Sequence, residues 1–417
     1  MKAVYLPWLH MHQPMVWIDS NELIGNLEKM LRSTDSRDRW DGRLMARAYR
    51  NPAQWIENLT VDGKNPKIAV DYSGILLENL AALNASQASE QEGTDADGNP
   101  IRDAIDIWRK ALHEHSDSIE FAGTAYAHCY FPVTPEEDWR LQIDQWKKTF
   151  TSLFGIESAK RVKGFWLPEM GVPPAEKMGK LVKLLKDEGY EWLILPIEAV
   201  NAHKNLSFEK QVEIFAQPHT LRTQEGNITV IFRPKYDFID QQAGCDANGI
   251  YQKCSLASRI LERTQRKGPA LVVPASDGEN GNIMMNQYFS DTFIPFFKEK
   301  SDHDVGSMTV TQLIKEYPPD HEIQLETTGS SWLDSHANWQ TGDKRLEMKH
   351  KIEQLSNKFH TQPRKIQENE TALKALLMTE TSCYVYWNSD FWFTQGRRMI
   401  EFAYQKMKQI IEPKDTP

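Results

Sequence analysis

Two acidic residues, Glu169 and Asp277, lie at positions that are typical of catalytic residues in α/β proteins. Glu169 follows the apolar run Phe165-Trp166-Leu167-Pro168, and Asp277 follows the apolar run 270–274. Both runs are typical of buried strands, so both carboxyl groups are expected just past a strand's C-terminal end. In barrels and open α/β sheets this edge carries the active site. Glu279 lies two residues beyond Asp277 and adds a third acid to the same edge.

A pair of carboxylates on different strands suits glycoside hydrolysis. One carboxylate attacks the anomeric carbon, and the other, kept protonated, donates to the leaving oxygen and then activates water or a sugar hydroxyl. A retaining enzyme needs the two groups roughly 5–5.5 Å apart. Each acid also has a structural interpretation: Glu169 as an acid at the start of the next helix, and Asp277 as a turn residue before Gly278. The repetition of polar groups at one predicted edge favours a site.

Histidines accompany the carboxylates. His10 and His12 end the first predicted strand, 3–9, and on an extended backbone they point to the same side. His128 follows a later strand. These histidines and Asp277 could form the zinc site of a metal-dependent deacetylase or related hydrolase. A His-x-His pair can equally hydrogen-bond sugar hydroxyls, and no local motif demands zinc. On these residues alone, the zinc site stays open as an alternative.

The elements that must position these groups alternate between strand and helix. Apolar runs end in the polar groups His10/His12, Asp71, His128, Glu169 and Asp277/Glu279, and helical patterns separate them over about the first 300 residues. This order predicts an α/β fold with a parallel sheet and covering helices. The number of strands suggests closure into a barrel.

After Ser301 the pattern changes to helices, with few strand signals. Helical periodicity is expected over 311–317, 345–360, 370–378 and 397–411. We therefore expect a catalytic (β/α) barrel over residues 1–300. The mainly helical region 301–417 should pack on the barrel and contribute to the substrate cleft.

The composition of the chain limits which kinds of molecule it is expected to bind and where it is expected to be located. The chain has 417 residues and a formal net charge of −9, which argues against nucleic acid or an anionic membrane as the main partner. No apolar stretch reaches membrane-spanning length, and polar residues interrupt the apolar N-terminal run, so we expect a cytoplasmic protein. Four scattered cysteines without a Cys-x-x-Cys motif favour free thiols. Nothing in the sequence indicates an oligomeric state.

Four of the 13 tryptophans can be assigned to two groups by their surroundings in the sequence. Trp139 and Trp146 lie on one face of a predicted helix, 135–154, and are expected in the core. Trp332 and Trp339 lie in a stretch rich in Gly, Ser, Asp and Asn. They are the better candidates for stacking on sugar rings.

Three motifs together resemble glycoside hydrolase family 57. They are His10-x-His12-Gln13-Pro14, Phe165-Trp166-Leu167-Pro168-Glu169 and Ser276-Asp277-Gly278-Glu279, in the family's order. Trp-Leu-Pro-Glu is the most specific of the three. The segment 123–128 is similar to the second motif of the family, and 329–332 with Asn338-Trp339 resembles its aromatic segment. The resemblance covers roughly residues 1 to 400.

The resemblance implies an incomplete (β/α)7-type barrel with a C-terminal helical domain. It also implies a retaining mechanism on α-linked glucans that uses neither a metal nor another cofactor. By position, Glu169 is expected to be the nucleophile and Asp277 the general acid/base. The residues expected to bind substrate are His10, His12, His128, Trp166, Glu279, Trp332 and Trp339. Glu279 is also expected to orient neighbouring side chains. The activity could be that of an amylase, a 4-α-glucanotransferase or a branching enzyme, with an α-glucan or oligosaccharide as substrate.

Two departures from the family pattern leave the specificity open. Cys383 stands where many members have Asp, and the chain is shorter than expected of branching enzymes. Two other functions compete with glycosyl transfer to water or sugar: the metal-dependent deacetylase-like hydrolase, and a non-catalytic carbohydrate-binding protein on the same fold. The presence of both expected carboxylates disfavours the binding protein.

Overall fold

The strands form an open barrel. In the computed structural model, which describes residues 1–19, 21–85, 94–264, 267–298 and 304–411, parallel ladders run in the order β12–β2–β5–β6 and then β7–β8–β10. A parallel bridge from Gly123 to Phe165 joins the two sets. The bounds are β2 Trp8–Met11, β5 Ile68–Tyr72, β6 Ile119–Phe121, β7 Gly164–Trp166, β8 Trp192–Pro196, β10 Gly226–Arg233 and β12 Ala275–Asp277.

Two prolines divide strands that the sequence predicts as continuous. The run 3–9 splits at Pro7 into β1 (Ala3–Tyr5) and β2, and 270–274 splits at Pro274 into β11 (Ala270–Val272) and β12. Proline has no N–H to donate to a ladder, so the strand changes partner there. β1 pairs with β11, and β2 with β12. Among the described residues no ladder joins β10 to β11 or β12, so the barrel is incomplete.

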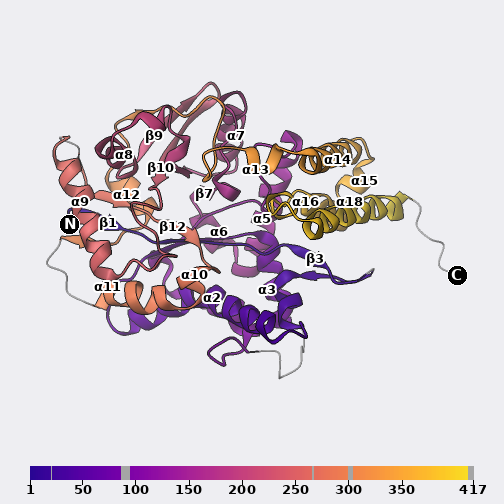
Figure 1. Ribbon diagram of the computed structural model, residues 1–417, viewed down its shortest axis with the longest axis horizontal. Coiled ribbons are helices and arrows are strands. Elements are labelled where there is room, and N and C mark those ends of the chain that lie inside the picture. Colours follow the sequence, from indigo (N-terminus) through magenta and orange to yellow (C-terminus); the bar gives the residue numbers. More distant parts are fainter. Residues whose placement is uncertain (20, 86–93, 265–266, 299–303, 412–417) are drawn as a thin grey trace.

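Strand alternation sorts side chains between two cores. Val4, Leu6 and Trp8 point into the barrel with residues such as Trp192 and Ile231, whereas Ala3, Tyr5 and Leu9 face the outer helices. Because successive strand residues face opposite sides, Trp8 and His10 share the inner face. Helices α2 (Ser36–Val61), α3 (Gly74–Ala85), α4 (Ala104–Glu114), α5 (Glu136–Phe154), α7 (Ala175–Asp187), α8 (Phe208–Phe215) and α9 (Ala247–Glu262) cover the strands (Figure 1).

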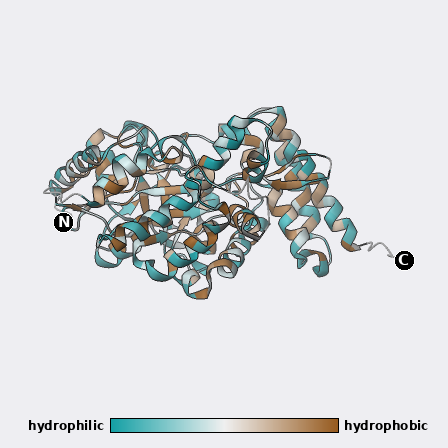
Figure 2. Cartoon of the chain, turned by 90° about the horizontal axis from the view of Figure 1, so that it is seen from below, coloured by the Kyte–Doolittle hydropathy of each residue, from teal (hydrophilic) through white to brown (hydrophobic). Residues whose placement is uncertain are grey.

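The helical patterns read from the sequence match the helices of this layer. Trp139 and Trp146 on α5 are 2% and 1% exposed, which confirms their expected place in the core. Helices at the surface carry hydrophilic and hydrophobic residues side by side along their length (Figure 2), as one-sided burial requires. No helix among the described residues is long and apolar enough to cross a membrane.

Segments just after the expected boundary at residue 300 still pair with strands of the barrel. The expected boundary falls at 299–303, outside the described residues. Beyond it, β13 (Val305–Gly306) pairs with β1, and β14 (Glu322–Ile323) pairs with β9 (His219–Thr223). Between them, α12 (Val310–Glu316) inserts Val310 and Leu313 into the inner core. The first segment after the expected boundary therefore belongs to the barrel.

The helices after α12 form a projection at one end of the barrel, with α14, α16 and α18 side by side (Figure 1). They share a core of their own around Met348, Leu355 and Phe393. The bounds are α13 Ala337–Gln340, α14 Asp343–His360, α15 Arg364–Gln367, α16 Glu370–Thr379, α17 Cys383–Tyr386 and α18 Asp390–Ile411. The segment between α16 and α17 returns to the barrel, where Ser382 N–H donates to the carbonyl of His128.

Candidate active site

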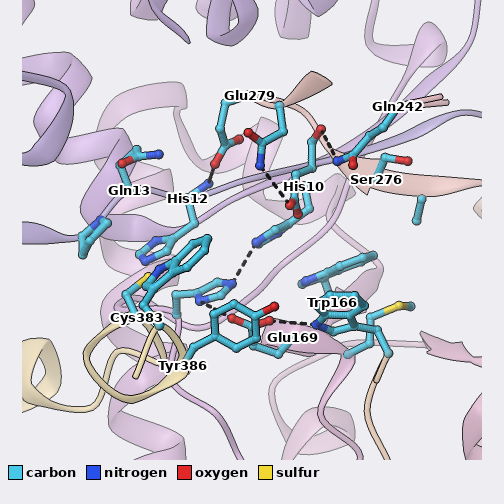
Figure 3. A pocket seen from close by; sticks show the side chains of 18 of the residues that line it. His10, His12, Gln13, Trp166, Glu169, Gln242, Ser276, Glu279, Cys383 and Tyr386 are labelled. Carbon is cyan, nitrogen blue, oxygen red and sulfur yellow. Dashed lines mark hydrogen bonds and ion pairs between the residues drawn. The ribbon is translucent and has the colours of Figure 1, made fainter. Parts of the chain in front are cut away.

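A cavity of about 630 Å³ opens where the C-terminal ends of the strands meet the helical projection. Strand-end residues line one side, and residues of the C-terminal region line the other; Figure 3 shows Glu169 and Tyr386 close together below His10. The lining residues include His10, His12, His128, Trp166, Glu169, Asp277, Glu279, Trp332 and Tyr386. Sites of this size and aromatic content suit small ligands and sugar chains.

Glu169 sits three residues beyond β7, on backbone in the left-handed region (φ 57°, ψ 18°). A non-glycine residue in this region is strained, and such strain gathers at functional sites. The carboxylate accepts two hydrogen bonds: Ser382 Oγ donates to Oε1 at 2.7 Å, and Trp332 Nε1 donates to Oε2 at 3.0 Å. It is therefore bound from the C-terminal region rather than serving as an acid at the start of α7.

Burial raises the pKa of Glu169, and the hydrogen bonds from Ser382 and Trp332 oppose that rise. The side chain is 14% exposed, so the cavity reaches it. A buried carboxylate with two fixed donors and one open face can attack a carbon atom placed in the cavity.

Asp277 and Glu279 differ in environment although they are close in sequence. Asp277, the last residue of β12, is exposed to the cavity and lies beside His10 in the ladder. Glu279 is 7% exposed, and its Oε1 accepts the N–H of His12 at 3.2 Å. Burial, with Asp277 nearby, raises the pKa of Glu279 to about 8. Asp277 is therefore open to the cavity, while Glu279 is buried and mostly protonated at neutral pH.

The three histidines form a wall of stacked rings. His128 stacks on His12 with ring centroids 4.1 Å apart, and on His10 at 4.8 Å. Each ring nitrogen has a neighbour: His10 contacts Asp71 and His128, His12 contacts Ser73 and Thr381, and His128 contacts His10 and Ser382. The expected common orientation of His10 and His12 follows from their alternation along the strand.

This wall suits hydrogen bonding better than metal binding. Ligand atoms of His12, His128 and Cys383 lie within 4.8 Å of one another. An imidazole binds a metal in its own ring plane, however, and the His12 and His128 planes are only 7° from parallel. Their lone pairs therefore run side by side instead of converging on one ion. Burial and the neighbouring Glu169 raise the pKa of Cys383 to about 12, so its sulfur is a thiol at neutral pH.

Among the tryptophans expected to contact substrate, two line the cavity and one does not. Trp332 borders it and donates to Glu169. Trp166 borders it with its ring parallel to that of His10, at 5.1 Å and 11°. Trp339 lies outside the cavity lining and is 1% exposed. It stacks on Tyr130 at 4.1 Å within the core of the helical projection.

Comparison with known proteins decides the family. The model of glycosyl hydrolase family 57 matches residues 3–326, a range that contains Glu169, Asp277 and the three histidines. The chain belongs to glycosyl hydrolase family 57. This confirms the resemblance drawn from the three motifs. No curated protein sequence matches the chain.

Solved family 57 structures share the fold. The family 57 branching enzyme of Thermococcus kodakaraensis superposes with a TM-score of 0.67 at 15% identity, covering 98% of this chain and 90% of that chain. The 4-α-glucanotransferase of Thermococcus litoralis gives 0.63 at 17% identity, covering 98% of this chain and 60% of that chain. The α-amylase of Thermotoga maritima gives 0.61 at 12% identity, covering 100% and 95%. The chain thus spans less than two thirds of the glucanotransferase.

Several residues that line the cavity or contact Glu169 were not predicted from the sequence. Ser382, and the aromatic residues Tyr236, Tyr386, Trp387 and Trp392, reach the site from loops and from the helical projection. Trp387 is 56% exposed at the cavity, an unusual position for a large aromatic residue. The aromatic segment Tyr384-Val385-Tyr386-Trp387 was the available signal, but its distance in sequence from Glu169 hides the contact.

Proposed function

We propose that the protein is a retaining glycoside hydrolase or transglycosylase acting on α-linked glucans. The observation that carries this proposal is the pair Glu169 and Asp277 at one aromatic-lined cavity, reached from different strands. The family 57 neighbours are named as a glucanotransferase, a branching enzyme and an amylase, which supports an α-glucan as substrate.

In the proposed first step, Glu169 attacks the anomeric carbon as the bond to the leaving oxygen breaks. Asp277 gives its proton to that oxygen, and a glycosyl ester on Glu169 remains. In the second step Asp277 takes a proton from water or from a sugar hydroxyl, whose oxygen then displaces Glu169. The two steps restore both carboxyl groups and retain the anomeric configuration.

The histidine wall and the tryptophans supply the binding groups of this proposal. Trp166 borders the cavity, so its ring can contact a sugar bound there. Exposed Trp387 offers a flat face to a glucan farther out. No step requires a metal, because the carboxyl groups provide both the nucleophile and the proton.

The test is turnover by Glu169→Gln, which keeps the shape of the side chain and removes the charge. We expect kcat on amylose and on maltooligosaccharides to fall by orders of magnitude, with the folded state retained by circular dichroism. Glu176→Gln, on the exposed first turn of α7, is the matched control and should keep full activity. Near-normal turnover by Glu169→Gln would refute the assignment.

The products identify the acceptor. Shorter sugars indicate hydrolysis, redistributed linear chains indicate transfer, and new α-1,6 linkages indicate branching. Glucan binding by calorimetry with no product from any substrate would instead support the carbohydrate-binding protein.

A further inference from the structure

A continuous line of hydrogen bonds connects buried Asp71 to Glu169. Asp71 Oδ2 contacts His10 Nδ1 at 2.7 Å, and His10 Nε2 contacts His128 Nε2 at 2.8 Å. His128 Nδ1 contacts Ser382 Oγ at 3.0 Å, and Ser382 Oγ donates to Glu169 Oε1 at 2.7 Å. The line crosses the barrel mouth from β5 through β2 to the helical projection.

Proton counting gives the line one direction. Ser382 has a single hydroxyl proton, which Glu169 accepts, so Ser382 must accept from His128 Nδ1–H. His128 is neutral because burial lowers its pKa well below the usual range, so its Nε2 has a lone pair that accepts from His10 Nε2–H. His10 also faces a carboxylate through Nδ1. His10 therefore carries protons on both nitrogens and is an imidazolium ion.

The surroundings of His10 agree with this charge. Burial alone would lower its pKa, but the charge of Asp71 and its hydrogen bond to His10 raise that pKa to about 9. Asp71 is 0% exposed and is also bound by Trp8 Nε1 at 2.8 Å, so it is held in place at both oxygens. A buried ion pair of this kind is costly to assemble, which is expected where it serves the site.

We propose that Asp71 and Ser382 are positioning residues for the nucleophile. Asp71 holds a positive charge on His10, and the directed chain through His128 makes Ser382 a permanent donor to Glu169. This line of hydrogen bonds favours the ionised form of Glu169 and holds its Oε1 in place. This role rests on the proposed function of Glu169, but the proton positions in the chain can be tested without turnover.

Other titratable groups lie near His10 and Glu169, at the two ends of the line of hydrogen bonds. These groups also affect the pKa values of His10 and Glu169. Around His10 and Glu169 these groups are His12, Asp277, Glu279, Cys383, Tyr130 and Tyr386. Asp277 opposes ionisation of Glu169, and His10 favours it. Burial raises the pKa of Glu169 most strongly, and the hydrogen bond from Ser382 is the largest of the contacts that lower it.

Nitrogen-15 NMR of histidine-labelled protein shows directly which nitrogens along the line of hydrogen bonds carry protons. Signals are assigned with the variants His10→Asn and His128→Asn. At pH 7 we expect His10 protonated on both nitrogens and His128 protonated on Nδ1 alone. In Asp71→Asn the amide oxygen can still accept from Trp8 while its nitrogen donates to His10 Nδ1, so His10 should be neutral at pH 7. A neutral His10 in the wild type, or a proton on His128 Nε2, overturns the proposal.

The pH profile of kcat/KM tests the consequence for Glu169. Ser382→Ala should lower kcat/KM about tenfold on the acid side of the profile, which is the effect of losing one hydrogen bond to a charged group. Ser382→Thr should restore kcat/KM on the acid side. Asp71→Asn should also lower kcat/KM on the acid side of the profile. Glu57→Gln, in a carboxylate–histidine pair with His115 away from the cavity, should leave the limb unchanged.

If Ser382→Ala leaves kcat/KM unchanged on the acid side of the profile, the positioning role is overturned. Absence of turnover in the wild type on every α-glucan would count against the proposed function only. The NMR result would then test the proton positions along the line of hydrogen bonds without any need for turnover.

Discussion

Trp332 and Trp339 resemble each other in sequence context but differ in surroundings, and paired substitutions to phenylalanine separate them. Trp339 is 1% exposed, stacks on Tyr130 at 4.1 Å and 16°, and lies 5.6 Å from Tyr386. Its Nε1 has no hydrogen-bond partner among the described residues, so phenylalanine removes packing alone. Trp332 donates to Glu169 from the edge of the cavity.

The sizes of the two effects follow from these contacts. Trp339→Phe keeps one stacked ring and loses roughly 50 Å² of buried apolar area, and with the small cavity left behind it should cost about 1–2 kcal/mol of unfolding free energy. Trp339→Ala should cost about 3–5 kcal/mol. Trp332→Phe should change stability by less than about 1 kcal/mol but lower kcat/KM about tenfold, because a hydrogen bond to a charged group is lost.

Denaturant unfolding and steady-state kinetics on one α-glucan measure both quantities for both variants. We expect Trp339→Phe to shift the unfolding midpoint and leave KM unchanged. We expect Trp332→Phe to lower kcat/KM and leave the unfolding midpoint nearly unchanged. A raised KM with unchanged stability in Trp339→Phe would show that Trp339 meets the substrate after all, and that its place in the helical core is wrong for the working enzyme.

Three further outcomes are expected. Trp387→Ala should raise KM severalfold for long glucans and little for short maltooligosaccharides, because about 1 kcal/mol of stacking is lost outside the catalytic centre; Trp40→Ala, exposed on α2, is the control and should change neither value. Between about pH 4.5 and 8 the unfolded chain releases the proton that folded Glu279 keeps, so stability falls as pH rises through this window. Glu279→Gln should therefore flatten the fall in unfolding free energy measured across these pH values, and an unchanged slope would contradict the buried neutral acid. Chelator treatment should leave turnover intact; loss of activity, with recovery on adding zinc, would support the metal-dependent alternative.

Local sequence signals predict the barrel half of the site well. An apolar run ending in Pro-Glu places Glu169 past a strand, and alternation places His10 and His12 on one side. Neither inference requires knowledge of distant contacts. Strand breaks at Pro7 and Pro274 were missed because a strand's change of partner depends on its neighbours in the sheet.

The C-terminal half could not be predicted in the same way. Trp339 stands in a polar stretch, and only its contact with Tyr130, more than 200 residues earlier, shows that it is buried. Ser382 has no local feature that marks it as a donor to Glu169, because the hydrogen bond spans 213 positions. Such contacts arise from the packing of the helical projection on the barrel.

The most direct measurement of the central claim is covalent trapping of the glycosyl-enzyme. A 5-fluoro-α-glucosyl fluoride, which forms the ester faster than the ester turns over, is incubated with the protein, and the digest is analysed by mass spectrometry. We predict one added fluoroglucosyl unit on the peptide that contains Glu169, and none in Glu169→Gln. A label on the peptide that contains Asp277 and Glu279, or turnover with inverted anomeric configuration and no label, would contradict the account.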